Sequence, residues 1–369
     1  MSPSKPNLAR MAAEAQVPWY REMTRYQWTV LIVAWLGWVF DVFDTALFNF
    51  AKAPMLKQMI GEEAYKLQGP ALEGRIQMLF LIGWAVGGLI FGIAADRWGR
   101  TRTLTLTILL YCLFTGLTAL CQTPEQVMGI RFLTAIGIGG EWAAGAALLA
   151  EVVPNRARAG AAALLQSAAA FGPWLAAITA LLLKNAPWQT LFWIGVLPAL
   201  LTVWIRFSVK EPERWQAARA VDKGHAFSTL RDVFGHVTWR RHVLVALVLG
   251  LVGIAGAGNV AFWLPNLVNG VSQGMAQSDI TARTSYATLI MHSGTMLGVL
   301  AFPWLAEKIG RRPAFFAFFV ASPIAIALAT WGGGSYERLI WLAPVMAFFA
   351  IGLSAGFALY FPELFPTRL

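Results

Sequence analysis

The segment Ala95-Asp96-Arg97-Trp98-Gly99-Arg100 has a close copy, Ala306-Glu307-Lys308-Ile309-Gly310-Arg311, 211 residues later. A second pair of segments recurs at nearly the same offset. EVVPNR at 151–156 matches ELFPTR at 363–368, which is 212 residues further along the chain. Two pairs of segments at one offset indicate an internal duplication.

The composition sets the class of protein to which this duplication belongs. Of the 369 residues, 57% are apolar and only 13% are charged, whereas about a quarter of a soluble domain's residues are charged. This balance excludes a water-soluble enzyme. The apolar residues suffice for roughly ten spans of ~20 residues, the length that crosses the hydrocarbon core of a bilayer. The predicted fold class is therefore an all-α polytopic membrane protein.

Apolar runs bounded by charges or by Gly and Pro clusters predict ten spans. They cover residues 27–51, 76–95, 103–121, 126–150, 157–183, 188–206, 242–267, 284–304, 313–331 and 338–361.

The Lys and Arg residues predict how these spans are oriented. With a cytoplasmic N-terminus, 21 of the 29 lie on the inner side and seven, Lys52 among them, on the outer side, and Arg131 lies inside a span. This bias obeys the positive-inside rule. It also explains the net charge of +10 without nucleic acid as a partner, since the basic residues lie in short gaps between apolar runs. The partner implied is the lipid bilayer.

The offset and the spans together predict the domain organisation. Residues 1–26 form a cytoplasmic tail, 27–206 a six-helix bundle, 207–241 a charged cytoplasmic connector, and 242–369 a second bundle containing helices 7–10 only. The duplication would place two further helices beyond residue 369, so we expect a second bundle truncated after four helices. Parallel repeats of this kind build transporters whose substrate site lies at mid-membrane depth between the halves.

Two motifs carry a resemblance to a known family. The segment from Gly92 to Arg102 resembles the loop 2–3 motif of the major facilitator superfamily, and the segment from Arg131 to Glu141, with its glycines, resembles the family's helix 4 motif. The resemblance spans the whole chain and implies the fold of two six-helix bundles. Within the family, the segment 40–45 is similar to the paired-aspartate motif of proton-linked organic-acid symporters, such as carriers of sialic and aromatic acids.

The loop motif also has a physical interpretation. Gly99 permits a tight turn between two spans, and Asp96 lies where a charge at a helix end can meet a guanidinium or a helix terminus. The resemblance implies that this loop latches one conformation of the transporter, and the alternative is that its charges set topology alone. The residues expected in the latch are Asp96, Arg97, Gly99, Arg100, Glu151, Arg156, Glu307 and Arg311.

Charges within the spans are expected to be functional, because each costs at least ~2.5 kcal/mol to insert near the bilayer centre. Asp41 and Asp44 lie on one face of the first span. At ~1.5 Å per residue, Asp44 and Arg131 have matching depths toward the outer side. A carboxylate beside an arginine favours ionisation and an unpartnered buried one favours protonation. Movement between the two spans would therefore switch a proton at Asp41 or Asp44, and the alternative is a static ion pair.

Two further titratable groups lie inside spans. Glu141 follows a glycine run that permits close helix packing, and it is expected either to relay protons or to hydrogen-bond as a protonated acid. His292 is the only intramembrane histidine and can titrate near neutral pH. The alternative for His292 is a packed core residue.

The predicted substrate-binding residues are polar or aromatic. Asn259, Trp263 and Asn266 recur at helical spacing and share one face, although packing of helices is the alternative. Gln166 is a weaker candidate for substrate binding, and His292 is also among the predicted substrate-binding residues. The only Lys or Arg deep within a span is Arg131. One arginine with several amides suits a monocarboxylate or sugar acid better than a phosphate ester.

These patterns predict the function. We expect no cofactor and no metal site, since no nucleotide-binding loop is present and the connector histidines lack ligand spacing. The chain is predicted to be a proton-coupled symporter of a small organic anion, acting by alternating access as a monomer in a bacterial inner membrane. The alternatives are a sugar or polyol symporter, or a membrane sensor of the same fold that does not transport.

Overall fold

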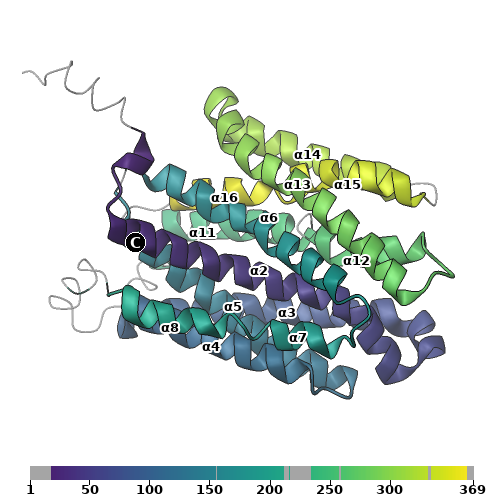
Figure 1. Ribbon diagram of the computed structural model, residues 1–369. Helices are drawn as coiled ribbons and strands as arrows, with labels where there is room; N and C mark the ends of the chain where they lie inside the picture. Colours follow the sequence, from purple (N-terminus) through teal and green to yellow (C-terminus); the bar gives the residue numbers. More distant parts are fainter. Residues whose placement is uncertain are drawn as a thin grey trace, which may run out of the picture.

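The structure is a computed structural model, and it describes residues 18–154, 156–211, 216, 234–256, 259–330 and 334–363. Every regular element in these residues is a helix. The helices run side by side along one common direction, with α13, α14 and α15 on one flank and α4, α7 and α8 on the other (Figure 1). Their bounds are α2 Arg25–Ile60, α3 Glu62–Trp98, α4 Arg100–Thr118, α5 Pro124–Val152, α6 Arg158–Leu182, α7 Gln189–Ile194, α8 Ala199–Ser208, α11 Val237–Gly250, α12 Val260–Gly270, α13 Gln277–Ile309, α14 Arg311–Thr330, α15 Tyr336–Ala350 and α16 Leu353–Glu363.

Helices α2 and α3 extend well past their predicted spans. The first apolar run ends at residue 51, yet α2 continues to Ile60, and α3 starts at Glu62 rather than near residue 76. An apolar run shows where a helix lies in hydrocarbon and not where its hydrogen bonding stops. The result is a pair of helical ends that continue past the predicted apolar runs.

Three predicted spans are interrupted in the structure. The sixth is divided into α7 and α8, with Pro198 at the break; the seventh consists of α11, a π-helical turn Leu251–Gly256 and α12; and the tenth is divided into α15 and α16 at Gly352. Proline cannot donate a helical hydrogen bond and glycine weakens a helix interior, so apolar runs that contain them need not form one straight helix.

The internal duplication is present in the packing. A Cβ atom on Gly87 of α3 would collide with the backbone of Ile136 on α5, and one on Gly298 of α13 would collide with the backbone of Phe348 on α15. One turn earlier, glycine meets a carbonyl group in the same way at Gly83–Phe132 and Gly294–Pro344. The glycines are 211 residues apart and their contacts 212. Each repeat therefore brings two helices together through small residues.

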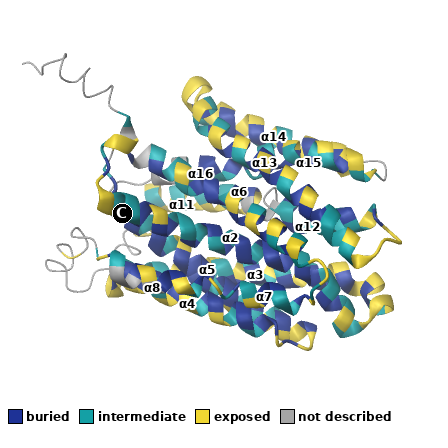
Figure 2. Cartoon of the chain, viewed as in Figure 1, coloured by how far each residue is buried: buried dark blue, intermediate teal, exposed yellow. Residues whose placement is uncertain are grey.

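Eight of the helices in the described residues are long and apolar enough to cross a membrane. Buried residues concentrate along α2 and in the middle of the bundle, whereas exposed residues lie mostly on its outside (Figure 2). Most of the exposed large side chains are apolar, as expected for helices that face lipid. We call the end with the α2–α3 turn the outer end, following the orientation predicted from Lys and Arg.

Parts of the predicted organisation lie outside the described residues. These are residues 1–17 of the tail, most of the connector, and residues 364–369, which include Pro366 and Arg368 of the second repeated motif. The connector prediction needs one change, since α11 begins at Val237, five residues before the predicted start of the seventh span.

Candidate functional site

An ion pair joins α2 to α5 inside the bundle. Arg131 Nη1 lies 2.8 Å from Asp44 Oδ2, and each side chain is only 1% exposed. The hydroxyl of Thr115 on α4 donates to the other carboxylate oxygen of Asp44 at 2.5 Å. The guanidinium carbon lies 4.5 Å from the ring centroid of Phe48 and 4.8 Å from that of Phe80. The depth match expected between Asp44 and Arg131 therefore corresponds to a direct contact.

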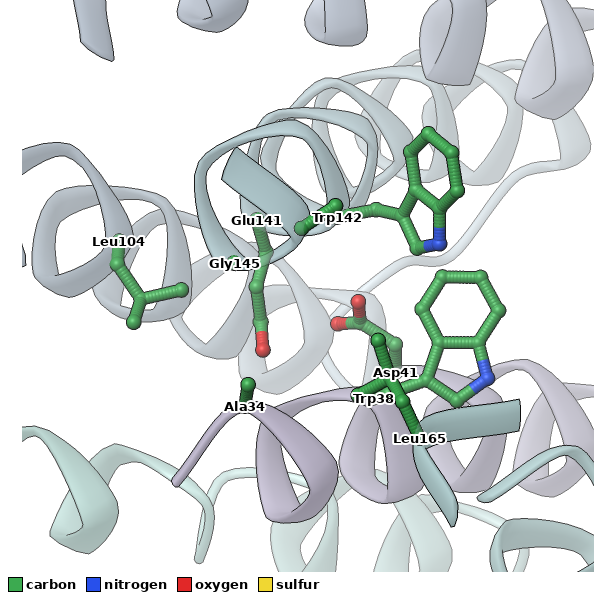
Figure 3. Close-up of a pocket in the computed structure, with 9 residues that line it drawn as sticks. Ala34, Trp38, Asp41, Leu104, Glu141, Trp142, Gly145 and Leu165 are labelled. Carbon is green, nitrogen blue, oxygen red and sulfur yellow. The ribbon is translucent and has the colours of Figure 1, made fainter. Parts of the chain in front are cut away.

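Asp41 lies one turn away on α2, and its surroundings are different. Its carboxyl group and that of Glu141 on α5 point toward each other across a small cavity (Figure 3). The cavity measures about 10 Å³, which is about the room that one water molecule needs and far below the volume of an organic substrate. Its lining consists of Ala34, Trp38, Asp41, Leu104, Glu141, Trp142, Gly145, Ala146 and Leu165.

The carboxyl groups at this cavity have few partners. Within the described part of the chain, both carboxyl oxygens of Asp41 and Glu141 Oε2 lack a hydrogen-bond partner, as does Trp38 Nε1. Gly37 permits the approach of the two helices, because a Cβ atom there would overlap the carboxyl group of Glu141. Buried polar groups are nearly always hydrogen-bonded, so unpartnered acids at this depth suggest a site that exchanges a ligand or a proton.

The predicted substrate residues of the seventh span lie against α3 rather than around a cavity at mid-membrane depth. Asn266 Nδ2 donates to Glu73 Oε2 at 2.8 Å, and Asn259 Oδ1 accepts from Gln77 Nε2 at the same distance. The indole ring of Trp263 lies over a lysine of α2, with its centroid 5.0 Å from the ammonium nitrogen. The shared helical face is as predicted, but in this conformation it forms helix contacts.

Gln166 also forms a contact between helices, whereas the contact of His292 with Thr295 lies within its own helix. Gln166 Nε2 on α6 donates to the carbonyl oxygen of Ser354 on α16 at 3.0 Å. His292 on α13 is 3% exposed, and its Nδ1 lies 3.2 Å from the hydroxyl of Thr295. Their roles in substrate binding remain predictions.

Four of the predicted latch residues of the first repeat lie close together: Asp96, Gly99, Arg100 and Glu151. Arg100 donates from Nε to Glu151 Oε1 at 2.9 Å and also pairs with Asp96, which links α4 to α3 and α5. Gly99 has a φ of 115°, and its counterpart Gly310 in the second repeat has a φ of 94°, backbone conformations that favour glycine.

The remaining latch residues lie at other places on the inner side. Arg156 Nη1 lies 2.6 Å from Glu22 Oε1, so its partner comes from the segment before α2. Arg97 is exposed on the last turn of α3, Glu307 is exposed near the end of α13, and Arg311 begins α14. Their part in a latch remains a prediction.

Sequence reasoning missed the burial of Lys52, although it placed the residue toward the outer end. It was counted among the outer charges, and Arg131 was taken as the only cation deep in a span, but Lys52 is fully buried in α2. Its ammonium nitrogen lies 3.1 Å from Glu73 Oε2, and Glu73 is also fully buried. Lys52 follows directly after an apolar run, so the end of that run was interpreted as the start of a loop. The continuation of the helix buries it instead.

Glu211 was also missed, because the connector was interpreted as a solvated linker. Its carboxylate accepts hydrogen bonds from the backbone N–H groups of Thr101 and Arg102, at 3.2 and 3.1 Å. These are free N–H groups of the first turn of α4, where a negative charge is stabilising. The first residues of the connector are therefore bound to the inner end of α4.

Comparisons with known proteins agree with this architecture. The family model described as Major Facilitator Superfamily matches residues 34–368. The chain is 33% identical to the "Probable 4-methylmuconolactone transporter" of Cupriavidus pinatubonensis, over 95% of this chain and 79% of that protein. It is 28% identical to the "Sialic acid transporter NanX" of Escherichia coli, over 95% and 83%.

A solved structure shares the fold. The partially occluded inward-open conformation of the xylose transporter XylE from E. coli aligns with a TM-score of 0.69 and 18% identity, over 92% of this chain and 88% of that one. With the apolar helices and the repeated glycine contacts, these matches make the chain a multi-pass integral membrane protein and a transporter rather than an enzyme. It belongs to the major facilitator superfamily.

Proposed function

We propose that this chain is a proton-coupled symporter of a small organic carboxylate, working by alternating access in a bacterial inner membrane with its N-terminus in the cytoplasm. The observation that carries the proposal is the pair of facing, largely unpartnered carboxyl groups of Asp41 and Glu141, located one helical turn from the ion pair of Asp44 and Arg131.

The charges of these four residues suggest which of them carries the proton. Asp44 and Arg131 neutralise each other. Among the described residues no cation pairs with Asp41 or Glu141, so two ionised carboxylates would place uncompensated charge in a dry interior, at high cost. A proton shared by the two acids removes one of these two negative charges, and a second proton would remove the other. When helix movement opens their cavity to water on one side, hydration of the carboxylates allows the proton to leave.

Arg131 provides a way to couple the proton to the substrate. Its Nε–H has no hydrogen-bond partner within the described residues, so it retains a donor while paired with Asp44. Arginine binds carboxylates through two parallel hydrogen bonds. A substrate carboxylate that approaches Arg131 would compete with Asp44, and proton uptake by this group of acids would favour that exchange.

The relatives support a carboxylate as the substrate class. Proteins similar to this chain carry names that include sialic acid, niacin and cis,cis-muconate, all of which are carboxylic acids. We propose Arg131 as the group that recognises the carboxylate, with Asn259, Trp263, Asn266, Gln166 and His292 becoming available when the helix contacts described above open.

The inner side is proposed to hold a latch. The pairs of Arg100 with Asp96 and Glu151 connect three helices at one point, next to the strained turn at Gly99 and the exposed Arg97. Breaking these pairs would free α3 and α4 from α5 when the inner side opens. Arg156 with Glu22, and Glu307 with Arg311 in the second repeat, are proposed to support the same closed arrangement.

Uptake in proteoliposomes tests this function. A panel of labelled sialic, aromatic and muconic acids, with a labelled sugar as comparison, is presented with and without an inwardly directed proton gradient. We expect accumulation of one carboxylate class only with the gradient. Gradient-driven uptake of the sugar alone would support the sugar symporter, and no uptake of any compound would support a sensor.

A further inference from the structure

A buried polar cluster closes the outer end of the molecule, about 12 Å beyond Asp44 along α2 at 1.5 Å per residue. Its centre is the ion pair of Lys52 and Glu73, with both side chains fully buried. The hydroxyl of Tyr65 donates to Glu73 Oε1 at 2.5 Å. These three residues belong to α2 and α3, which are adjacent in sequence.

The remaining partners of this ion pair come from α12, in the second repeat. Lys52 Nζ donates to the carbonyl oxygen of Phe262 at 2.6 Å and lies 3.5 Å from the centroid of the Phe262 ring. Glu73 Oε2 accepts from Asn266 Nδ2 at 2.8 Å. Both members of the pair therefore have one partner that belongs to the other repeat.

A second contact lies one turn deeper. Gln77 follows Glu73 by four residues on α3, and its amide donates to Asn259, the N-cap residue of α12, at 2.8 Å. Because Glu73 and Gln77 share one face of α3, and Asn259 and Asn266 share one face of α12, the two contacts line up along a single interface. The interface runs between the repeats and not within either one.

We propose that Lys52, Tyr65, Glu73, Phe262 and Asn266 form the outer gate of the transporter, a proposal that rests on the alternating-access function above. In the closed state α12 provides a carbonyl oxygen, an aromatic face and an amide to the ion pair of Lys52 and Glu73, which would otherwise lack these partners. When α12 withdraws, water replaces these three partners, and the ion pair of α2 and α3 remains. The gate is thus held by partners that hydration can replace.

The competing explanation is a brace that only holds α2 to α3. A brace between those two helices requires Lys52, Glu73 and Tyr65 but no contact with α12. The two explanations differ in what happens when a single partner is removed. A gate shifts the balance between open and closed outer ends, whereas a brace leaves the distance between α3 and α12 unchanged.

The test is a distance measurement by double electron–electron resonance between spin labels at the outer ends of the two repeats. Gln68→Cys on α3 and Gln273→Cys after α12 are exposed positions for the labels, on a background with Cys112→Ser and Cys121→Ser. Asn266→Leu removes the amide from Glu73 and leaves the ion pair intact. Because a hydrogen bond to a charged group contributes about 1.5–3 kcal/mol, we expect the ratio of open to closed distances to rise at least about tenfold.

Lys52→Met is the second variant, and it leaves Glu73 buried without its cation, so a larger rise in the open fraction is expected. Lys66→Met is the matched control, because Lys66 pairs with Glu63 on the exposed surface of α3 and its loss should not change the distances. If Asn266→Leu keeps the distance distribution of the unsubstituted chain, the gate is ruled out, whether or not Lys52→Met folds. No substrate is added, so the result does not depend on which molecule is carried.

Discussion

Asp41 and Asp44 are one helical turn apart on α2, yet they have opposite surroundings. Asp44 receives a guanidinium and a hydroxyl, whereas Asp41 faces another acid across a small cavity. An aspartate side chain is thus suited to a permanent charge at position 44 and to proton exchange at position 41. Sequence reasoning treated the two as equal candidates for the protonation site, and the contacts now favour Asp41.

Replacing Asp44 should reduce stability more than it affects proton movement. Asp44→Asn leaves Arg131 buried without a counter-charge, and breaking a buried ion pair in this way costs about 3–5 kcal/mol. We expect a clearly lower melting temperature in detergent, measured by intrinsic tryptophan fluorescence. Glu63→Gln, at an exposed ion pair, is the control. If Asp44→Asn melts no lower than Glu63→Gln, the ion pair is not a stabilising element.

At the scale of the helix, close approach through glycine is the feature that both repeats share. Gly87→Ala places a methyl group against the backbone of Ile136 and must separate α3 from α5. Overpacking of this kind costs about 1–3 kcal/mol, so we expect lower thermal stability and lower transport. The control is Gly92→Ala on the same helix, where nothing lies within 4 Å of the added atom. Equal stability of the two variants would contradict the packing described.

At the inner end of α4, Glu211 caps the first turn of the helix. Glu211→Ala removes the acceptor of two backbone N–H groups, and loss of a helix cap costs about 1 kcal/mol. We therefore expect a modest drop in melting temperature, measured against Glu63→Ala as the exposed acidic control. A drop no larger than that of the control would mean that the contact between Glu211 and α4 contributes nothing to stability.

The helices show what an apolar run does and does not predict. Eight of the ten predicted spans coincide with stretches that are helical, long and apolar enough to cross a membrane, because their apolar composition is set by the bilayer. The breaks at Pro198, Gly352 and the π-helical turn could not be predicted, since hydropathy does not report backbone hydrogen bonding. The burial of Lys52 was missed for the same reason, because α2 continues past the last apolar residue and carries the lysine into contact with α3 and α12.

For the whole molecule, the depth of a residue along its helix could be predicted, but the neighbour that its side chain faces could not. The match of Asp44 with Arg131 follows from counting residues along two antiparallel helices. Whether Asn266 faces a cavity or Glu73, and whether Asp41 faces Glu141, depends on how each helix is rotated and on which conformation the molecule occupies. Those properties are set by packing between the repeats, which a single sequence does not display.

In the proposed mechanism, protons and a carboxylate move together through the site at Asp41 and Glu141. The most direct measurement uses proteoliposomes that hold a pH-sensitive dye, with the membrane potential clamped and no initial pH gradient. Adding the transported carboxylate outside should acidify the lumen in step with uptake. Asp41→Asn combined with Glu141→Gln should abolish acidification, while protein-free liposomes report passive leak of the acid. Carboxylate uptake without acidification, or unchanged acidification by the double variant, would contradict this account.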